Sequence, residues 1–312
     1  MRLHGELDVE FPRARPPRIH QRKTGPMPSS IDSSTTPRDR SSLRADCSNC
    51  FALCCTAFGF QRSIEFPIDK PAGTPCRNLA ENFSCSIHAT LRGRGFRGCT
   101  VFDCFGAGQY VSQILFDGQS WRDRPETRAR MFQAFGVARQ LHEMLWLLAE
   151  AATRAISPDT EDAIVRLRHD LTLVLGNDPS ALLDLRVDSI RSEVRDVLVA
   201  VSEEARASYL AGAADIRQDD LEPAADLTGR DLRSRQMCGA DLRGASLIAA
   251  DLRGADLTAV DLLGADMRDA RLHEADLSRA LFVTQMQINA CQGDEATVLP
   301  DALERPVHWT TH

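Results

Sequence analysis

Eight of the ten cysteines in this 312-residue chain lie between residues 47 and 104. Thiolates that are two to four residues apart can converge on one soft cation, which neutralises their mutual repulsion and fixes the loops around it. The first four follow the spacing C-x2-C-x3-C-C. On a helix, three of them would share one face and the fourth would point about 100° away, toward a second centre or the core. The pattern predicts a metal site with these candidate ligands: Cys47, Cys50, Cys54, Cys55, Cys76, Cys85, His88, Cys99 and Cys104.

The compartment bears on this prediction. The sequence begins without the apolar core of a signal peptide and contains no run of about 20 apolar residues, so we expect a cytoplasmic protein with no membrane span. Because a reducing cytosol keeps thiols from pairing, we favour metal binding over a disulfide-stapled domain. We also favour it over the alternative that the cysteines act as small buried hydrophobes. Zinc is the expected ion and an iron–sulfur cluster is the alternative, because thiolates suit both. His88 is the weakest candidate, because a lone histidine is more often a hydrogen-bonded bystander.

Residues 47–109 resemble the YkgJ-like family of zinc- or iron-chelating proteins. The resemblance rests on the C-x2-C-x3-C-C opening, the later C-S-I-H stretch that ends at His88, and the final cysteine pair. That family usually carries an R-P-x-x-C-R segment, whereas this chain has R-G-C-T around Cys99. The ligand set of the final pair therefore stays open. The resemblance implies chelation and no particular activity.

Residues 225–282 repeat every five positions, with a large apolar residue at each centre and an alanine two positions before most centres. An unbroken period of five fits neither an α-helix nor a flat strand. A four-sided solenoid would place the centres and alanines inside and the Asp, Arg, Gly, Ser and Thr positions outside. The predicted inward centres are Leu227, Leu232, Met237, Leu242, Leu247, Leu252, Leu257, Leu262, Met267, Leu272, Leu277 and Phe282.

This segment resembles the pentapeptide-repeat family, whose motif is A(D/N)LXX. The resemblance implies a right-handed quadrilateral β-helix. Most members have no known activity, and a few are similar to duplex DNA in shape and charge and protect gyrase. Duplex mimicry needs a dominant acidic face, whereas arginines here nearly cancel the aspartates. The chain's net charge of −7 also argues against bulk nucleic-acid binding. The arginines are Arg230, Arg233, Arg235, Arg243, Arg253, Arg268, Arg271 and Arg279.

The region between the cysteines and the repeats has helical patterning. A Ser-Pro-Asp cap at Ser157 opens one helix. A later apolar seam runs from Leu183 to Val201 at spacings of 4, 3, 4, 3 and 4. The seam predicts packing inside this region, with a homodimer contact as the alternative.

The predicted fold class is a multidomain α+β protein. The expected domains are a disordered tail at 1–44, a cysteine-rich metal-binding domain at 45–110, a helical region at 111–210, a pentapeptide β-helix at 214–283, and a C-terminal cap and tail at 284–312.

The sequence favours a non-enzymatic protein, because it contains no Ser–His–Asp order, carboxylate pair or H-E-x-x-H motif in the helical region. The leading hypothesis is a metal-stabilised cysteine domain and helical bundle joined to a solenoid that docks a protein partner. The alternative is an iron–sulfur or redox enzyme that uses the cysteine cluster and has the solenoid as scaffold. A gyrase-directed DNA mimic ranks third.

Overall fold

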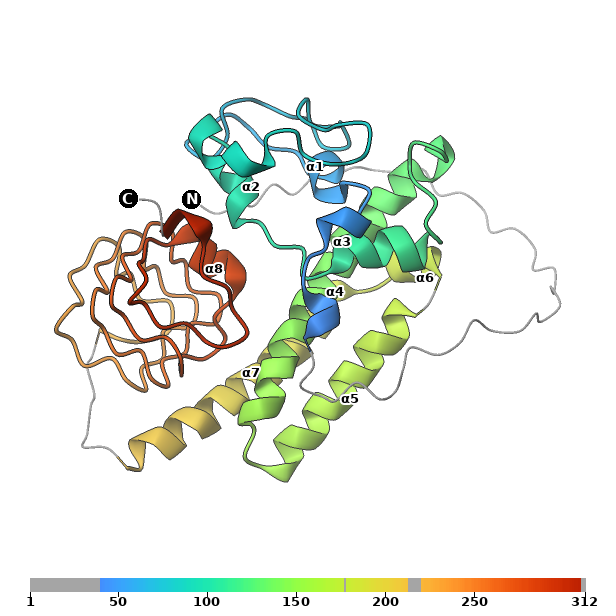
Figure 1. Cartoon of the computed structure of the whole chain (residues 1–312). Helices are drawn as coiled ribbons and strands as arrows, with labels where there is room; N and C mark the ends of the chain where they lie inside the picture. The colour runs from blue at the N-terminus through green and yellow to red at the C-terminus, as the bar shows by residue number, and fades with distance from the viewer. Residues whose placement is uncertain (1–39, 177, 213–219, 310–312) are drawn as a thin grey trace. The chain divides into compact units, whose positions relative to one another are not determined.

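The computed structural model describes residues 40–176, 178–212 and 220–309 (Figure 1). Most of the predicted tail, residues 1–39, lies outside them. These described residues belong to one compact unit, which opens with a 3-10 turn, η1 (Ser41–Leu43), that buries Leu43. No helix in the described ranges combines the length and the apolar character needed to cross a bilayer.

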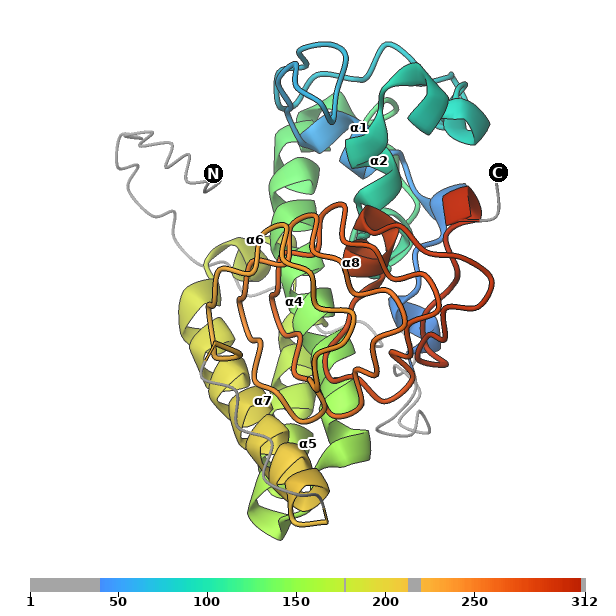
Figure 2. The ribbon, with the colours of Figure 1, turned by 90° about the vertical axis from the view of Figure 1, so that its left-hand side faces the viewer.

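The middle of the chain is helical, and its longest helix packs against several others (Figure 2). Met131, Phe135 and Leu148 of that longest helix, α4, are fully buried in the core. The principal helices are α4 (Arg128–Arg154), α5 (Pro158–Leu175), α6 (Pro179–Leu183) and α7 (Val187–Leu210). Shorter elements are η2 (Cys47–Asn49), α1 (Leu53–Ala57), η3 (His88–Thr90), η4 (Arg92–Arg94), α2 (Arg97–Val101), α3 (Ala107–Gln109), the π-helical η5 (Tyr110–Leu115), η6 (Pro125–Thr127), α8 (Gln285–Ala290) and η7 (Val307–Trp309).

Helix boundaries in this region agree with the sequence at one point and differ at another. Ser157 caps α5 as predicted, because its hydroxyl accepts the N–H of Thr160 at 3.3 Å. The predicted seam from Leu183 onward is wrong as a single helix, since α6 ends at that residue and α7 follows as a separate helix. The face that α7 buries consists of Val194, Leu198, Val201 and Ser202, and α7 packs against α4.

The predicted α+β class with a right-handed quadrilateral β-helix is wrong, because the described residues contain no β-strand and no sheet. The repeats form stacked turns joined by isolated parallel bridges, such as Asp226–Ser246 and Asp231–Asp251 (Figure 1). These bridged residues are twenty positions apart, so four pentapeptides make one coil. Each side of the coil offers one bridging residue before the next turn. One bridging residue per side is too few for a β-strand, which needs several consecutive residues paired with a neighbouring chain segment.

The inside of the coiled stack is apolar, as the five-residue period predicts. All twelve pentapeptide centres are buried, and Leu257 has no exposed surface. Smaller side chains two positions before the centres are buried as well, including Ala250 and Ala270. The assignment of the centres to the interior is confirmed, and burial of apolar area is what holds the stack together.

The aspartate that precedes most centres has a local structural task. In Asp256 and Asp276 one carboxylate oxygen accepts the backbone N–H two residues later, at 2.9 and 2.8 Å. Such Asx turns satisfy backbone donors that the bridges leave over. Where arginine is that later residue, it also pairs with the aspartate, as Arg253 does with Asp251 at 2.8 Å. The repeat motif therefore neutralises much of its own acidic charge.

The stack is tied to the helices by buried polar contacts. Glu150 of α4 accepts the N–H of Phe282 at 2.8 Å. Arg206 of α7 lies 3.1 Å from the carboxylate of Asp241. At the end of the stack, α8 follows, and Gln287 donates its side-chain N–H to two carbonyls of the coil below. The repeats are thus packed on α4 and α7 and capped by α8.

Candidate metal centre

The chain around the first two cysteines is fixed to the segment that follows the last one. The N–H of Asp46 donates to Oε1 of Gln109 at 3.1 Å. The N–H of Phe51 donates to Oγ of Ser112 at 2.9 Å. These bonds hold η2, which contains Cys47, against α3 and the start of η5. They bring together thiols that are more than fifty residues apart in the sequence.

The sulfurs of Cys50 and Cys104 both lie next to Gly108. A Cβ atom added at Gly108 would lie 2.8 Å from Sγ of Cys50 and 3.6 Å from Sγ of Cys104. Burial raises the pKa of both thiols, and negative charge on Cys104 raises that of Cys50 further. Cys47 is a neighbour of the same group, because its charge raises the pKa of Cys104.

Cys54 and Cys55 are consecutive residues of α1, and their sulfurs are 3.9 Å apart. The expectation that one helix would present the first three cysteines on a common face is wrong. Ala52 adopts a left-handed conformation with φ of 55° and separates α1 from the earlier turn. A hydrogen bond with Cys54, together with the nearby ammonium of Lys70, lowers the pKa of Cys55 to about 7, although burial opposes the shift.

A second set of cysteines gathers around Cys55. Its carbonyl accepts the N–H of Cys76 at 3.0 Å. An antiparallel bridge then joins Leu79 to Cys85. Burial, followed by the charges of Cys55, Cys76 and Cys85, raises the pKa of Cys99 in α2 to about 12. Cys99 therefore lies in the electrostatic surroundings of the other three thiols.

Lys70 lies among the thiols with only 5% of its surface exposed. Its ammonium donates to the carbonyls of Thr74 at 2.8 Å and Thr56 at 3.2 Å. No carboxylate pairs with it among the residues that the structure describes. Burial lowers its pKa, while the surrounding thiols, Cys76 and Cys55 foremost, raise it.

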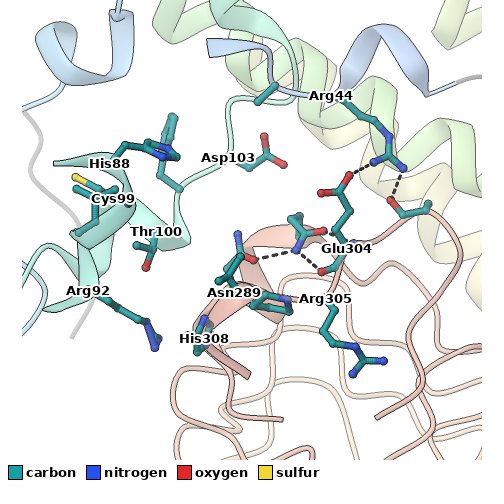
Figure 3. Close-up of a pocket in the computed structure, with 18 of the residues that line it drawn as sticks. Arg44, His88, Arg92, Cys99, Thr100, Asp103, Asn289, Glu304, Arg305 and His308 are labelled. Atoms are coloured by element: carbon teal, nitrogen blue, oxygen red, sulfur yellow. Dashed lines mark hydrogen bonds and ion pairs between the residues drawn. The ribbon is translucent and has the colours of Figure 1, made fainter. Parts of the chain in front are cut away.

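The nine predicted ligands are thus brought together only in part. Throughout the described residues, no group of three or more His, Cys, Asp or Glu side chains already has the arrangement of a metal site. All ten cysteines are free thiols. His88 is exposed at the start of η3 and lines a cavity that Cys99 also lines (Figure 3). As donors, the eight thiols suit a soft ion such as zinc, because each is a reduced sulfur ligand.

The cavity that His88 borders has a volume of about 720 Å³. The residues of the cysteine segment that line it include Arg92, Cys99 and Asp103, and the facing wall comes from α8 and the chain after it (Figure 3). Arg44 and Glu304, which both line the cavity, form an ion pair of 2.5 Å. Sequence reasoning missed this cavity, because its walls come from segments about two hundred residues apart that carry no shared pattern.

Comparison with known proteins identifies the repeats of residues 224–282. "Pentapeptide repeats" are matched in eight copies, at residues 224–258 and 245–282. The chain therefore contains pentapeptide repeats in its C-terminal part. It is also 47% identical over 271 residues to the uncharacterized protein YybG of Bacillus subtilis (strain 168), an alignment that covers 86% of this chain and 95% of YybG. The chain belongs to the same family as YybG. Because the alignment extends far beyond the repeats, the family is defined by more than the repeats alone, while the resemblance of residues 47–109 to chelating proteins stays a prediction.

Proposed function

We propose that the cysteine-rich segment binds zinc in the reducing cytoplasm, and that the metal fixes this segment on α4 and the repeat stack. The protein would act by docking a partner and not by catalysis. The observation that carries the proposal is the poor core of the segment. Between residues 58 and 104 the buried hydrophobic side chains are only Leu91 and Phe96 among the described residues. Forty or more residues cannot be held by so little apolar burial.

Zinc would supply the missing stabilisation. A structural zinc site contributes on the order of 10 kcal/mol to the folding of small domains at neutral pH. Tetrahedral thiolate coordination needs no further cofactor and leaves no open position for substrate. An iron–sulfur cluster uses the same ligands, so the metal itself must be identified.

Partner docking is the second half of the proposal. Repeat proteins usually present surfaces and not catalytic pockets. A gyrase-directed DNA mimic is not favoured, because arginines such as Arg243 and Arg268 pair with the aspartates two residues earlier. A surface on which many of the acids are paired with neighbouring arginines lacks the field of a duplex.

Metal content of protein purified without oxygen, combined with hydrogen exchange before and after chelation, tests the proposal. We expect bound zinc, and we expect chelator to accelerate exchange in residues 46–106 while the repeats stay protected. As matched controls, Cys238→Ser and Cys291→Ser remove thiols outside the cluster and should leave the metal content unchanged. Less than about 0.2 metal per chain, with unchanged exchange in this segment, would contradict zinc binding. A visible chromophore with bound iron would favour the iron–sulfur alternative.

A further inference from the structure

We propose that the cavity between the cysteine-rich segment and residues 285–309 binds a small organic anion, in which an acid group is carried on an apolar body, and that Arg92 pairs with the acid. The acid is a carboxylate or a phosphate, because the fork of a guanidinium matches both. The cavity volume of about 720 Å³ is typical of small-molecule sites. This inference goes beyond metal binding and partner docking.

The cavity has apolar walls that suit the body of such a ligand. Leu43, Phe102 and Trp146 line it, and so do Pro306 and Val307 from the segment that follows α8. Leu43 and Trp146 are themselves buried. Small-molecule sites are mostly apolar and use a few polar groups to orient the ligand. Burial of the body against these side chains would therefore hold the ligand, and the charged residues of the lining would orient it.

The charged part of the lining has one arginine in excess. Arg44, Arg92 and Arg305 line the cavity together with two carboxylates, Asp103 and Glu304. Arg44 pairs with Glu304 at 2.5 Å, and Arg305 donates to backbone carbonyls. Asp103 accepts a backbone N–H at 2.8 Å. The remaining cation is Arg92.

Arg92 extends from η4 toward His308 on the facing wall (Figure 3). The next arginine on that wall, Arg97 of α2, already pairs with Asp269 at 2.6 Å. No ion pair or side-chain hydrogen bond joins Arg92 to any residue that the structure describes. A partly buried cation is costly unless an anion compensates it. The cavity therefore presents an uncompensated guanidinium to whatever enters it.

Two hydrogen-bond donors of the lining residues also lack partners. Nε of Arg92 and Nε1 of Trp146 are shielded from solvent and meet no acceptor in the described part of the chain. A buried tryptophan N–H usually has a partner, and an unmade hydrogen bond is destabilising. Both groups are donors, so the missing partner is an acceptor. An acid group supplies acceptor oxygens and negative charge together, whereas an amine or a purely apolar ligand does not.

Binding of simple probes to the full chain tests the proposal. Phenyl phosphate and benzoate are the anionic probes, benzyl alcohol is the neutral probe, and inorganic phosphate is the acid without a body. Ligand-observed NMR titrations measure the affinities. At least one aromatic anion should bind, and benzyl alcohol and inorganic phosphate should each bind about tenfold more weakly. A preference between phenyl phosphate and benzoate assigns the acid group.

Substitutions of the lining test which residues form the site. Arg92→Gln should weaken binding of the aromatic anion by about tenfold or more and leave benzyl alcohol unchanged. Arg92→Lys should recover part of the loss, because it restores the charge without the fork. Arg94→Gln removes an exposed arginine outside the lining and is the matched control. Ala89→Phe fills space at an exposed position of the lining and should weaken every probe.

The contrary outcomes are distinct. Equal affinity of the aromatic anion for Arg92→Gln and the wild type would remove Arg92 from the site. Absence of binding by both aromatic anions at millimolar concentration, or equal binding of inorganic phosphate, would overturn the proposed ligand class. Unchanged binding to Ala89→Phe would place the ligand outside the cavity. Far-UV circular dichroism and the metal content of Arg92→Gln should match the wild type, so that a folding defect is not mistaken for lost binding.

Discussion

The cysteine-rich segment and the repeat stack are similar in length, and neither contains a strand among its described residues, yet they are held together differently. The stack buries all twelve of its pentapeptide centres, whereas the stretch between residues 58 and 104 buries only two hydrophobic side chains among those the structure describes. A short period that places an apolar residue inward at each repeat generates its own core. A segment without such a repeat has no regular set of inward apolar residues, so it depends on contacts with other parts of the molecule.

The polar groups of the two regions show the same difference. In the stack, Asx turns and parallel bridges repeat from coil to coil, so backbone groups are satisfied within the region. In the cysteine segment, some carbonyls accept hydrogen bonds from long cationic side chains that lie outside it. Arg122 donates to the carbonyl of Ala80 at 3.1 Å, and Arg128, at the start of α4, donates to that of Gly73. The segment is therefore organised by its neighbours.

The largest effect expected from one substitution is in the stack. Leu257→Asp would bury a carboxylate without a partner where the wild-type side chain is fully enclosed. We expect a loss of at least about 4 kcal/mol in the free energy of unfolding. Denaturant unfolding measures it. Leu173→Asp, at a 57% exposed leucine of α5, is the control and should change stability by less than about 0.5 kcal/mol.

A milder substitution at the same position tests whether the two regions are independent. Hydrogen exchange in the milder Leu257→Ala variant should increase within residues 225–282, while the zinc content stays at the wild-type level. Equal sensitivity of Leu257 and Leu173 would contradict the inward assignment. Loss of zinc from Leu257→Ala would show that the repeats support the cysteine segment, and would contradict the independence of the two regions.

The interior of the stack could be predicted from the sequence, because the same five-residue pattern recurs in nearly every repeat. It failed at the secondary structure of the same region, since five-residue sides stop pairing after one bridge. In the cysteine segment, the candidate residues were evident, but their arrangement was not. The left-handed Ala52 breaks the expected helix, and the tie between η2 and α3 joins distant segments. Burial of Lys70 beside the thiols likewise left no signal in sequence spacing.

A pH effect should appear where the stack meets α7. Asp261 is fully buried, and burial raises its pKa to about 6 from an ordinary value near 4. Arg243, 3.6 Å away, lowers the pKa in part, and Asp241 raises it. Because the folded pKa lies above the unfolded one, the stabilising protonated form is present below pH 4. That stability is lost as the pH rises through 6.

Asp261→Asn removes this titration and keeps an acceptor for the N–H of Leu263. The variant should gain stability relative to the wild type as the pH rises from 4 to 7, by up to about 3 kcal/mol. Thermal unfolding at a series of pH values measures the difference. Asp226→Asn, at the same place in an exposed pentapeptide, should show no such gain, because hydrogen bonds from Thr228 lower the pKa of Asp226. A difference independent of pH would contradict the assignment to Asp261.

A smaller effect is expected from a methyl group placed in the cysteine segment. Gly108→Ala would set its Cβ 2.8 Å from Sγ of Cys50, which is too close for contact. A metal-free thiol can rotate away at little cost, whereas a sulfur held by zinc cannot. We expect a loss of about 1–3 kcal/mol in metal-bound protein, and little change after chelation. Gly136→Ala in α4 is the matched control, since nothing lies within 4 Å of the added atom. It should raise stability by up to about 1 kcal/mol through helix propensity alone. Equal costs of Gly108→Ala with and without metal would mean that Cys50 is not held by an ion, and would contradict the contrast between a segment fixed by metal and a stack fixed by its core.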